Sequence, residues 1–157
     1  MKNAPLFILI LSLFLSACAD DSKKQQAFLQ DIESLHTVGD SMTKNIKTDM
    51  RTINLQISDM VDNGVNIDLL GSFVDAYKEK ERKFNKCKSS WDEIYNKVNT
   101  ASIPDFSAEE ITAMKEKANS VNDSLKTLSS EMAKIHSQAM GILQEAREKG
   151  MQPEPAK

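Results

Sequence analysis

The side chains of this chain that could do chemistry are few and lie far apart in the sequence. Among 157 residues there are two cysteines, Cys18 and Cys87, and two histidines, His36 and His136. A catalytic nucleophile needs a base within hydrogen-bonding reach, and a zinc ion needs three or four ligands. The sequence has no Cys-x-x-Cys pair, no two histidines at helical spacing, no Gly-rich phosphate loop and no Ser/His/Asp pattern. We therefore expect no catalytic residues, no metal or cofactor site and no enzymatic activity.

Cys87 and His36 each allow one functional and one structural interpretation. Cys87 could form an intermolecular disulfide in an oxidising compartment, but its place in an apolar row beside Phe84 favours a small core residue. His36 has Asp40 four residues later, which would make half of a metal site. His36 directly follows Leu35, and His136 directly follows Ile135, two apolar residues that are expected in the core. We interpret both histidines as residues at the edge of the core.

The densest basic region of the chain is the run 78–83, with Lys86 and Lys88 after it. Such a run could contact anionic lipid headgroups or an acidic partner. Glutamates alternate with the basic residues, however, which favours the solvated face of a helix.

Three aromatic residues and two glutamates are the remaining candidates. Trp91, Tyr95 and Tyr77 could line a ligand groove, but their spacing is more typical of a helical core. Glu109 and Glu110 are paired acids, yet they stand where a helix should begin. Helix capping and the helix dipole explain them better than acid–base catalysis does.

The elements that would position these residues are three long amphipathic segments. The first carries an apolar stripe of nine steps in 33 residues, about 3.67 residues per step, which predicts a helix that is straight or slightly right-handed in its supercoil preference. Gly39 fills the one vacant step, and Asp62-Asn63-Gly64 is a strong turn signal. The stripe consists of Phe28, Ile32, Leu35, Met42, Ile46, Met50, Ile53, Ile57 and Val61.

The second segment is predicted to begin near Asp68 as N-cap and to end before Ile103-Pro104-Asp105, because proline disfavours helix at the preceding residue. Its apolar residues recur every seven positions, which indicates a heptad seam. One row is Leu70, Tyr77, Phe84, Trp91 and Val98, and the companion row is Phe73, Cys87 and Ile94, with Lys80 as its exception.

The third segment opens with a capping box, Ser107 and Glu110, and Gly150 is its expected end. Between them an apolar stripe runs unbroken at spacings of three and four. Its members are Ile111, Met114, Ala118, Val121, Leu125, Leu128, Met132, Ile135, Ala139, Ile142 and Ala146.

Three such helices predict an all-α fold, either an up-down-up bundle or an elongated helical hairpin or coiled coil. Aromatic residues make up only 6% of the chain and there are five glycines, which is unfavourable for a sheet protein. We expect the helical bundle domain to span residues 27–150, and residues 151–157, with two prolines, to form a disordered tail.

The N-terminus has the pattern of a secretory signal. Lys2 supplies a positive charge, and the apolar stretch from Leu6 to Leu15 is shorter than the roughly 20 residues that a transmembrane helix needs. It is followed by Leu15-Ser16-Ala17-Cys18, which resembles the lipobox of bacterial lipoproteins at all four positions. The resemblance implies a signal peptide at 1–17, cleavage before Cys18, lipidation of Cys18 and a polar tether over 18–26. Fully extended, this tether would reach at most ~29 Å.

The lipoprotein resemblance also suggests a location. In lipoproteins of enterobacterial type, Asp after the acylated Cys favours the inner membrane. Ala19 therefore favours the outer membrane with the domain facing the periplasm, although Asp20 and Asp21 keep the inner membrane open. The Gln26-Ala27-Phe28 start resembles uncharacterised small helical lipoproteins of enterobacteria, a likeness that transfers no site residues.

Net charge and composition suggest the class of partner. The formal net charge of −3 does not favour nucleic acid, which needs a basic footprint. We expect a non-enzymatic lipoprotein of the envelope, anchored in the membrane through Cys18, that presents a helical surface to a periplasmic protein partner as an adaptor, inhibitor or immunity-like factor. A homo-oligomer is the other association that we expect, and a small-ligand or lipid carrier is the alternative function.

Overall fold

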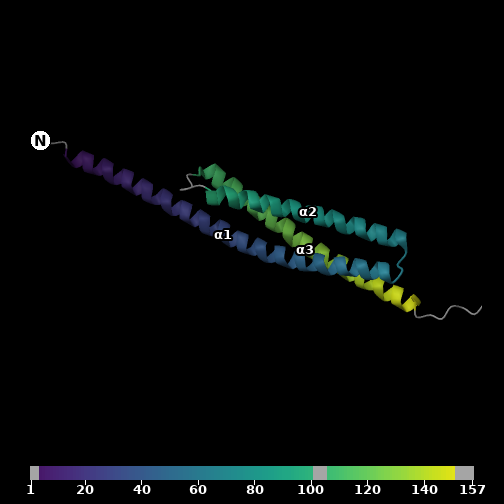
Figure 1. The fold of residues 1–157 in the computed structure, drawn as a ribbon. Coiled ribbons are helices and arrows are strands. Elements are labelled where there is room, and N and C mark those ends of the chain that lie inside the picture. The colour runs from purple at the N-terminus through teal and green to yellow at the C-terminus, as the bar shows by residue number, and fades with distance from the viewer. Residues whose placement is uncertain (1–3, 101–105, 151–157) are drawn as a thin grey trace, which may run out of the picture.

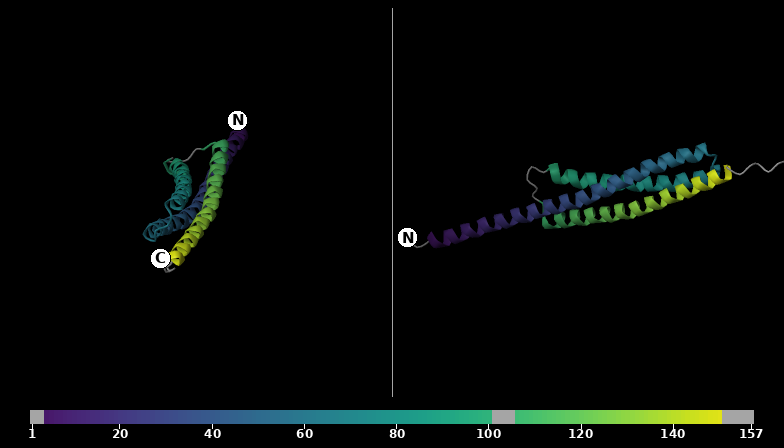
Figure 2. Two further views of the ribbon diagram at one scale, coloured as in Figure 1. Left: turned by 90° about the vertical axis from the view of Figure 1, so that its right-hand side faces the viewer. Right: turned by 90° about the horizontal axis from the view of Figure 1, so that it is seen from below.

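The protein is a bundle of three antiparallel α-helices, as the sequence predicts. The computed structural model describes the backbone of residues 4–100 and 106–150 and the side chains of residues 23–99 and 106–149. The helices are α1 (Ala4–Asp62), α2 (Ile67–Thr100) and α3 (Ala108–Gly150). They run up, down and up, and the N-terminal part of α1 projects well beyond the other two helices (Figure 1). The bundle is elongated from every side, and each helix contacts both others (Figure 2).

The predicted apolar stripes of α2 and α3 form the core. Phe73, Tyr77, Phe84, Trp91, Ile94 and Val98 of α2 are buried, and so are the central eight positions of the α3 stripe, from Met114 to Ala139. Near the end of α3, Leu143 is buried where the prediction had Ile142, which is half-buried. Lys80, the exception in the α2 seam, directs its ammonium group 3.1 Å from the Glu131 carboxylate of α3, with its side chain 20% exposed.

The stripe of α1 departs from the predicted period. Its most deeply buried aliphatic side chains from Ile32 onward are Ile32, Ile46, Ile53 and Met60, with the buried Gly39 between them, so that buried positions recur every seven residues. Eight of the nine predicted members of the stripe are buried or packed against the core, but Val61 is 59% exposed and Met60 is buried in its place, so the placement of Val61 was wrong. A seven-residue repeat corresponds to 3.5 residues per step, the spacing of a left-handed coiled-coil seam, and not to the predicted step of about 3.67.

The turn between α1 and α2 is built from two local motifs. The Gly64 amide donates to the Val61 carbonyl at 3.1 Å and the Val65 amide donates to the Met60 carbonyl at 3.0 Å, a Schellman motif. Gly64 has φ 67°, a conformation that costs glycine little. Asn66, not the predicted Asp68, is the N-cap of α2. Its Oδ1 accepts from the amides of residues 68 and 69 at 2.9 and 3.2 Å, so Asp68 lies inside the first turn.

The capping box of α3 is confirmed. The Ser107 amide donates to Glu110 Oε2 at 3.0 Å, and the Glu110 amide donates to Ser107 Oγ at 3.2 Å. The Ser107 amide, followed by Lys97, lowers the pKa of the Glu110 carboxyl below its ordinary value of 4.5.

This shift predicts a pH dependence. Because the folded pKa is lowered, the stabilisation by Glu110 is complete above pH 4.5 and is lost as the pH falls through the folded value. We expect Glu110→Gln to lose less stability than the wild type between about pH 5 and about pH 3, measured by urea unfolding. Glu109→Gln makes the same change of charge one residue away, outside the box, and is the matched control. Identical slopes for wild type and Glu110→Gln would contradict the role of this carboxylate.

The segment predicted as a polar tether, residues 18–26, is part of helix α1. Residues 23–26 are Lys-Lys-Gln-Gln, all good helix formers, and they continue α1 without a break. Among the side chains described, from residue 23 onward, the first that is buried is Phe28. The side chains of the predicted signal peptide and of Cys18 lie outside the described residues, as does the predicted tail at 151–157. Among the described residues, no helix is both long enough and apolar enough to cross a membrane.

Candidate functional site

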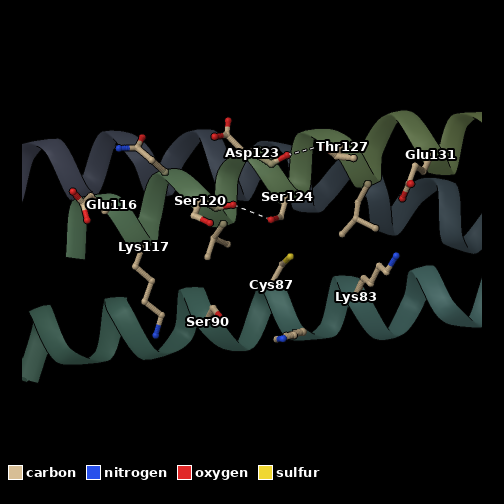
Figure 3. Close-up of a pocket in the computed structure, with 14 residues that line it drawn as sticks. Lys83, Cys87, Ser90, Glu116, Lys117, Ser120, Asp123, Ser124, Thr127 and Glu131 are labelled. Carbon is tan, nitrogen blue, oxygen red and sulfur yellow. Dashed lines mark hydrogen bonds between the residues drawn. The ribbon is translucent and has the colours of Figure 1, made fainter. Parts of the chain in front are cut away.

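A groove of about 920 Å³ lies between α2 and α3. Helix α2 contributes Lys83, Lys86, Cys87 and Ser90 to its lining (Figure 3). Helix α3 contributes a row of short polar side chains beside its buried stripe, notably Ser120, Ser124 and Thr127. Because these side chains are short, they leave space between the helices that longer residues would fill.

Two of the hydroxyl groups in the groove, those of Ser124 and Thr127, are held by their own helix. Ser124 Oγ donates to the Ser120 carbonyl at 2.8 Å, and Thr127 Oγ1 donates to the Asp123 carbonyl at 3.0 Å (Figure 3). Their protons are therefore engaged, while their oxygen lone pairs remain available to accept a hydrogen bond. The lining includes no histidine that could act as a base toward them. The arrangement can bind polar groups but offers no activated nucleophile.

Cys87 points into the groove from α2 (Figure 3). It is free, half-buried and packed against the core, which confirms its interpretation as a member of the apolar seam. Burial raises the pKa of its thiol, and nearby Lys86 opposes this only in part. The neutral thiol is thus favoured, which makes Cys87 a poor nucleophile. An intermolecular disulfide through Cys87 stays a prediction.

The predicted basic run lies along one edge of this groove. Lys83 pairs with Glu79 on its own helix at 2.8 Å, and Lys88 pairs with Asp92 at 3.1 Å. Apart from Lys80 and the half-buried Glu81, the run is exposed. Exposed pairs of this kind contribute about 0–1 kcal/mol. The run therefore matches the solvated helix face that its alternating acids predict.

His36, which we interpreted as a residue at the edge of the core, is half-buried and belongs to an aromatic cluster. The His36 ring stacks on Tyr95 with centroids 4.4 Å apart and meets Trp91 edge-on at 5.4 Å. Asp40 pairs with Lys44 at 2.8 Å, and this hydrogen bond lowers the pKa of its carboxyl. Within the described residues, no three His, Cys, Asp or Glu side chains are grouped to hold a metal ion.

The three candidate aromatic residues have different positions. Trp91 and Tyr77 are in the core, and the Tyr77 hydroxyl donates to the Met50 carbonyl of α1 at 3.4 Å. Burial raises the pKa of Tyr77. Tyr95 is 41% exposed, so its interpretation as a core residue was wrong. It follows Ile94 by one position and therefore lies at the edge of the seam, where its ring covers His36.

A buried polar relay joins all three helices, and the sequence did not predict it. Trp91 Nε1 of α2 donates to Asn122 Oδ1 of α3 at 3.0 Å, and Asn122 Nδ2 donates to the Leu35 carbonyl of α1 at 2.9 Å. Gly39 lies against this relay, since a Cβ there would be 2.7 Å from both Asn122 Oδ1 and Trp91 Nε1. The vacant step at Gly39 was the only signal for it in the sequence.

Comparison of the chain with protein-family models, with curated proteins and with solved structures finds no match in any of the three. The inference about function therefore depends on the residues and geometry of this chain.

Proposed function

We propose that this chain is a lipid-anchored protein of the bacterial envelope, without enzymatic activity, that holds its helical bundle end-on to the membrane and presents it to a protein partner. The anchor is the acylated Cys18, and the outer membrane is the expected location. The partner would recognise folded helical surface, as expected for an adaptor, an inhibitor or an immunity-like factor.

The observation that carries this proposal is the short distance in sequence between Cys18 and the core. Phe28, the first buried side chain among those described, meets Phe106 edge-on with ring centroids 5.7 Å apart, next to the start of α3. Ten residues from 18 to 28 reach at most ~36 Å when extended and ~15 Å when helical. An anchor at Cys18 would therefore hold this end of the bundle near the membrane, with the α1–α2 turn at the far end.

The described side chains support binding more than catalysis. The groove between α2 and α3 has engaged hydroxyl groups and a thiol whose pKa is raised. The His36 ring is packed against the aromatic rings of Trp91 and Tyr95. A long bundle with polar side chains along its outer faces is typical of proteins that offer helical surface to a partner.

The anchor is tested by Cys18→Ala. Without the sulfur there is no thioether to diacylglycerol, so we expect complete loss of fatty-acid label and accumulation of a larger precursor. Metabolic labelling and gel mobility measure both. A matched control is Cys87→Ala, which removes the other thiol and should leave the label unchanged. Equal label in wild type and Cys18→Ala would rule out lipidation at this residue.

A small-ligand carrier is the second candidate, and the groove between α2 and α3 favours it. Its volume of about 920 Å³ is within the range of small-molecule sites, although most of the residues that line it have polar or charged side chains. Native mass spectrometry of the purified protein separates the two functions. A stoichiometric bound small molecule, lost when Ser124→Leu fills the groove, would favour the carrier over the partner-binding protein.

A further inference from the structure

Several of the exposed large apolar side chains lie at the turn between α1 and α2. Val61, Ile67 and Leu69 are 59%, 83% and 48% exposed, and they lie within nine residues at one end of the bundle. They are three of the seven large apolar side chains with this much exposure in the described chain. Single exposed apolar residues need no explanation, but a cluster at one end does. We call residues 59–69 the tip.

The rigidity of the backbone makes the tip a fixed surface. The Schellman motif at Gly64 ends α1, and the Asn66 cap begins α2 directly after it. Met60 is fully buried and Val65 packs against the core, so both ends of the turn are anchored by core contacts. The exposed side chains of Val61 and Ile67 are thus carried by an ordered turn.

The charge of the tip has one sign. Between Arg51 and Lys78 the sequence has no Lys, Arg or His and four aspartates: Asp59, Asp62, Asp68 and Asp75. None of the four forms an ion pair with any described residue. Two of them, Asp59 and Asp62, stand in the last turns of α1, where the helix dipole disfavours a negative charge. Asp59 and Asp62 therefore do not stabilise their own helix, whereas Asp68 lies in the first turn of α2, where the helix dipole favours a negative charge.

We propose that the tip is a docking surface for a basic amphipathic segment of a partner protein. Its exposed apolar side chains would pack against the apolar face of that segment, and its unpaired aspartates would pair with flanking Lys and Arg. Only the distance of the tip from the membrane rests on the proposed function. The apolar and acidic character of the tip does not depend on the anchor.

The charge of the tip disfavours the other occupants of an apolar surface. An anionic membrane would repel the three unpaired carboxylates of the tip, Asp59, Asp62 and Asp68. A second copy docked tip to tip would place the same aspartates opposite one another, which is destabilising. A cationic partner, by contrast, would be attracted to these carboxylates and would form ion pairs with them.

Photocrosslinking in cells tests the proposal with the full-length chain. A benzoylphenylalanine at position 67 replaces the most exposed apolar residue, and mass spectrometry identifies the peptide to which it links. We expect a protein segment with a helical apolar stripe and a net positive charge. The double variant Asp59→Asn, Asp62→Asn should lower the yield of this product about fivefold, since two exposed ion pairs with the partner would be lost. Loss of these charges relieves the helix dipole, so unfolding of α1 would not explain the loss.

A matched control keeps the readout specific to the tip. Glu116→Gln with Asp123→Asn makes the same change of charge in the groove between α2 and α3 and should leave the yield unchanged. A link to a second copy, to lipid or to a neutral or acidic segment overturns the proposal, and so does the absence of any link. An acylated chain without the link rejects the tip alone. A chain that links but is not acylated rejects the anchor alone.

Discussion

Leu125→Ala is expected to destabilise the bundle by about 2–5 kcal/mol, a large share of the stability of a typical domain. Leu125 lies in the middle of α3 and is fully buried in the core. Truncation would leave a cavity in the core, at a position where fraying of the helix ends has least effect. Helix propensity cannot account for such a loss, since alanine forms helix better than leucine.

The matched control for this variant is Lys126→Ala. Lys126 is the next residue of α3 and is exposed, so its change should stay below about 0.5 kcal/mol. Urea unfolding of residues 26–157 would measure both variants. Equal and small effects would mean that α3 is not packed in the monomer, in which case the transition should depend on protein concentration.

The helices could be predicted because their signals are local and repeated. The row from Met114 to Ala139 needs only the period of its apolar residues, and the box of Ser107 and Glu110 needs only two side chains three residues apart. The end of α1 at Asp62 follows from the need for a positive φ at Gly64.

The errors arose where two local interpretations compete. Asn66 and Asp68 are both good N-cap residues, and only the path of the turn decides that Asn66 accepts the first amides of α2. The choice between Met60 and Val61 depends on whether the seam repeats every seven residues, which is set by the partner helices. Tyr95 is at the edge because His36, from another helix, offers its ring a surface.

The groove and the tip depend on contacts that a single sequence does not show. Cys87 and Ser124 are 37 positions apart, and their place in one groove follows from the register of α2 against α3. The aspartates of the tip were visible in the sequence, but their lack of ion pairs became apparent only when the neighbouring helices were in place. Gln56 is a further case, since its buried Oε1 accepts no hydrogen bond from a described residue.

Gly39→Ala should destabilise the protein, although replacing glycine by alanine in a helix usually stabilises it. In an open helical position this change stabilises by about 0.5–1 kcal/mol. At Gly39 the added Cβ would lie 2.7 Å from Trp91 Nε1 and 2.7 Å from Asn122 Oδ1, and 3.1 Å from Trp91 Cε2. The neighbours are a rigid indole ring and an amide held by two hydrogen bonds, so neither can move without breaking the relay. We expect a net loss of about 1–3 kcal/mol, as is typical of overpacking in a core.

The control for this variant is in the same protein. Gly141→Ala lies in the exposed part of α3, where a Cβ meets no atom within 4 Å, and it should stabilise by about 0.5–1 kcal/mol. Trp91 is the single tryptophan, so its fluorescence should shift to the red in Gly39→Ala and stay unchanged in Gly141→Ala. In an Asn122→Ala background the cost of Gly39→Ala should shrink, because one of the two clashing groups is gone. Stabilisation by both glycine variants would show that the relay does not pack against α1.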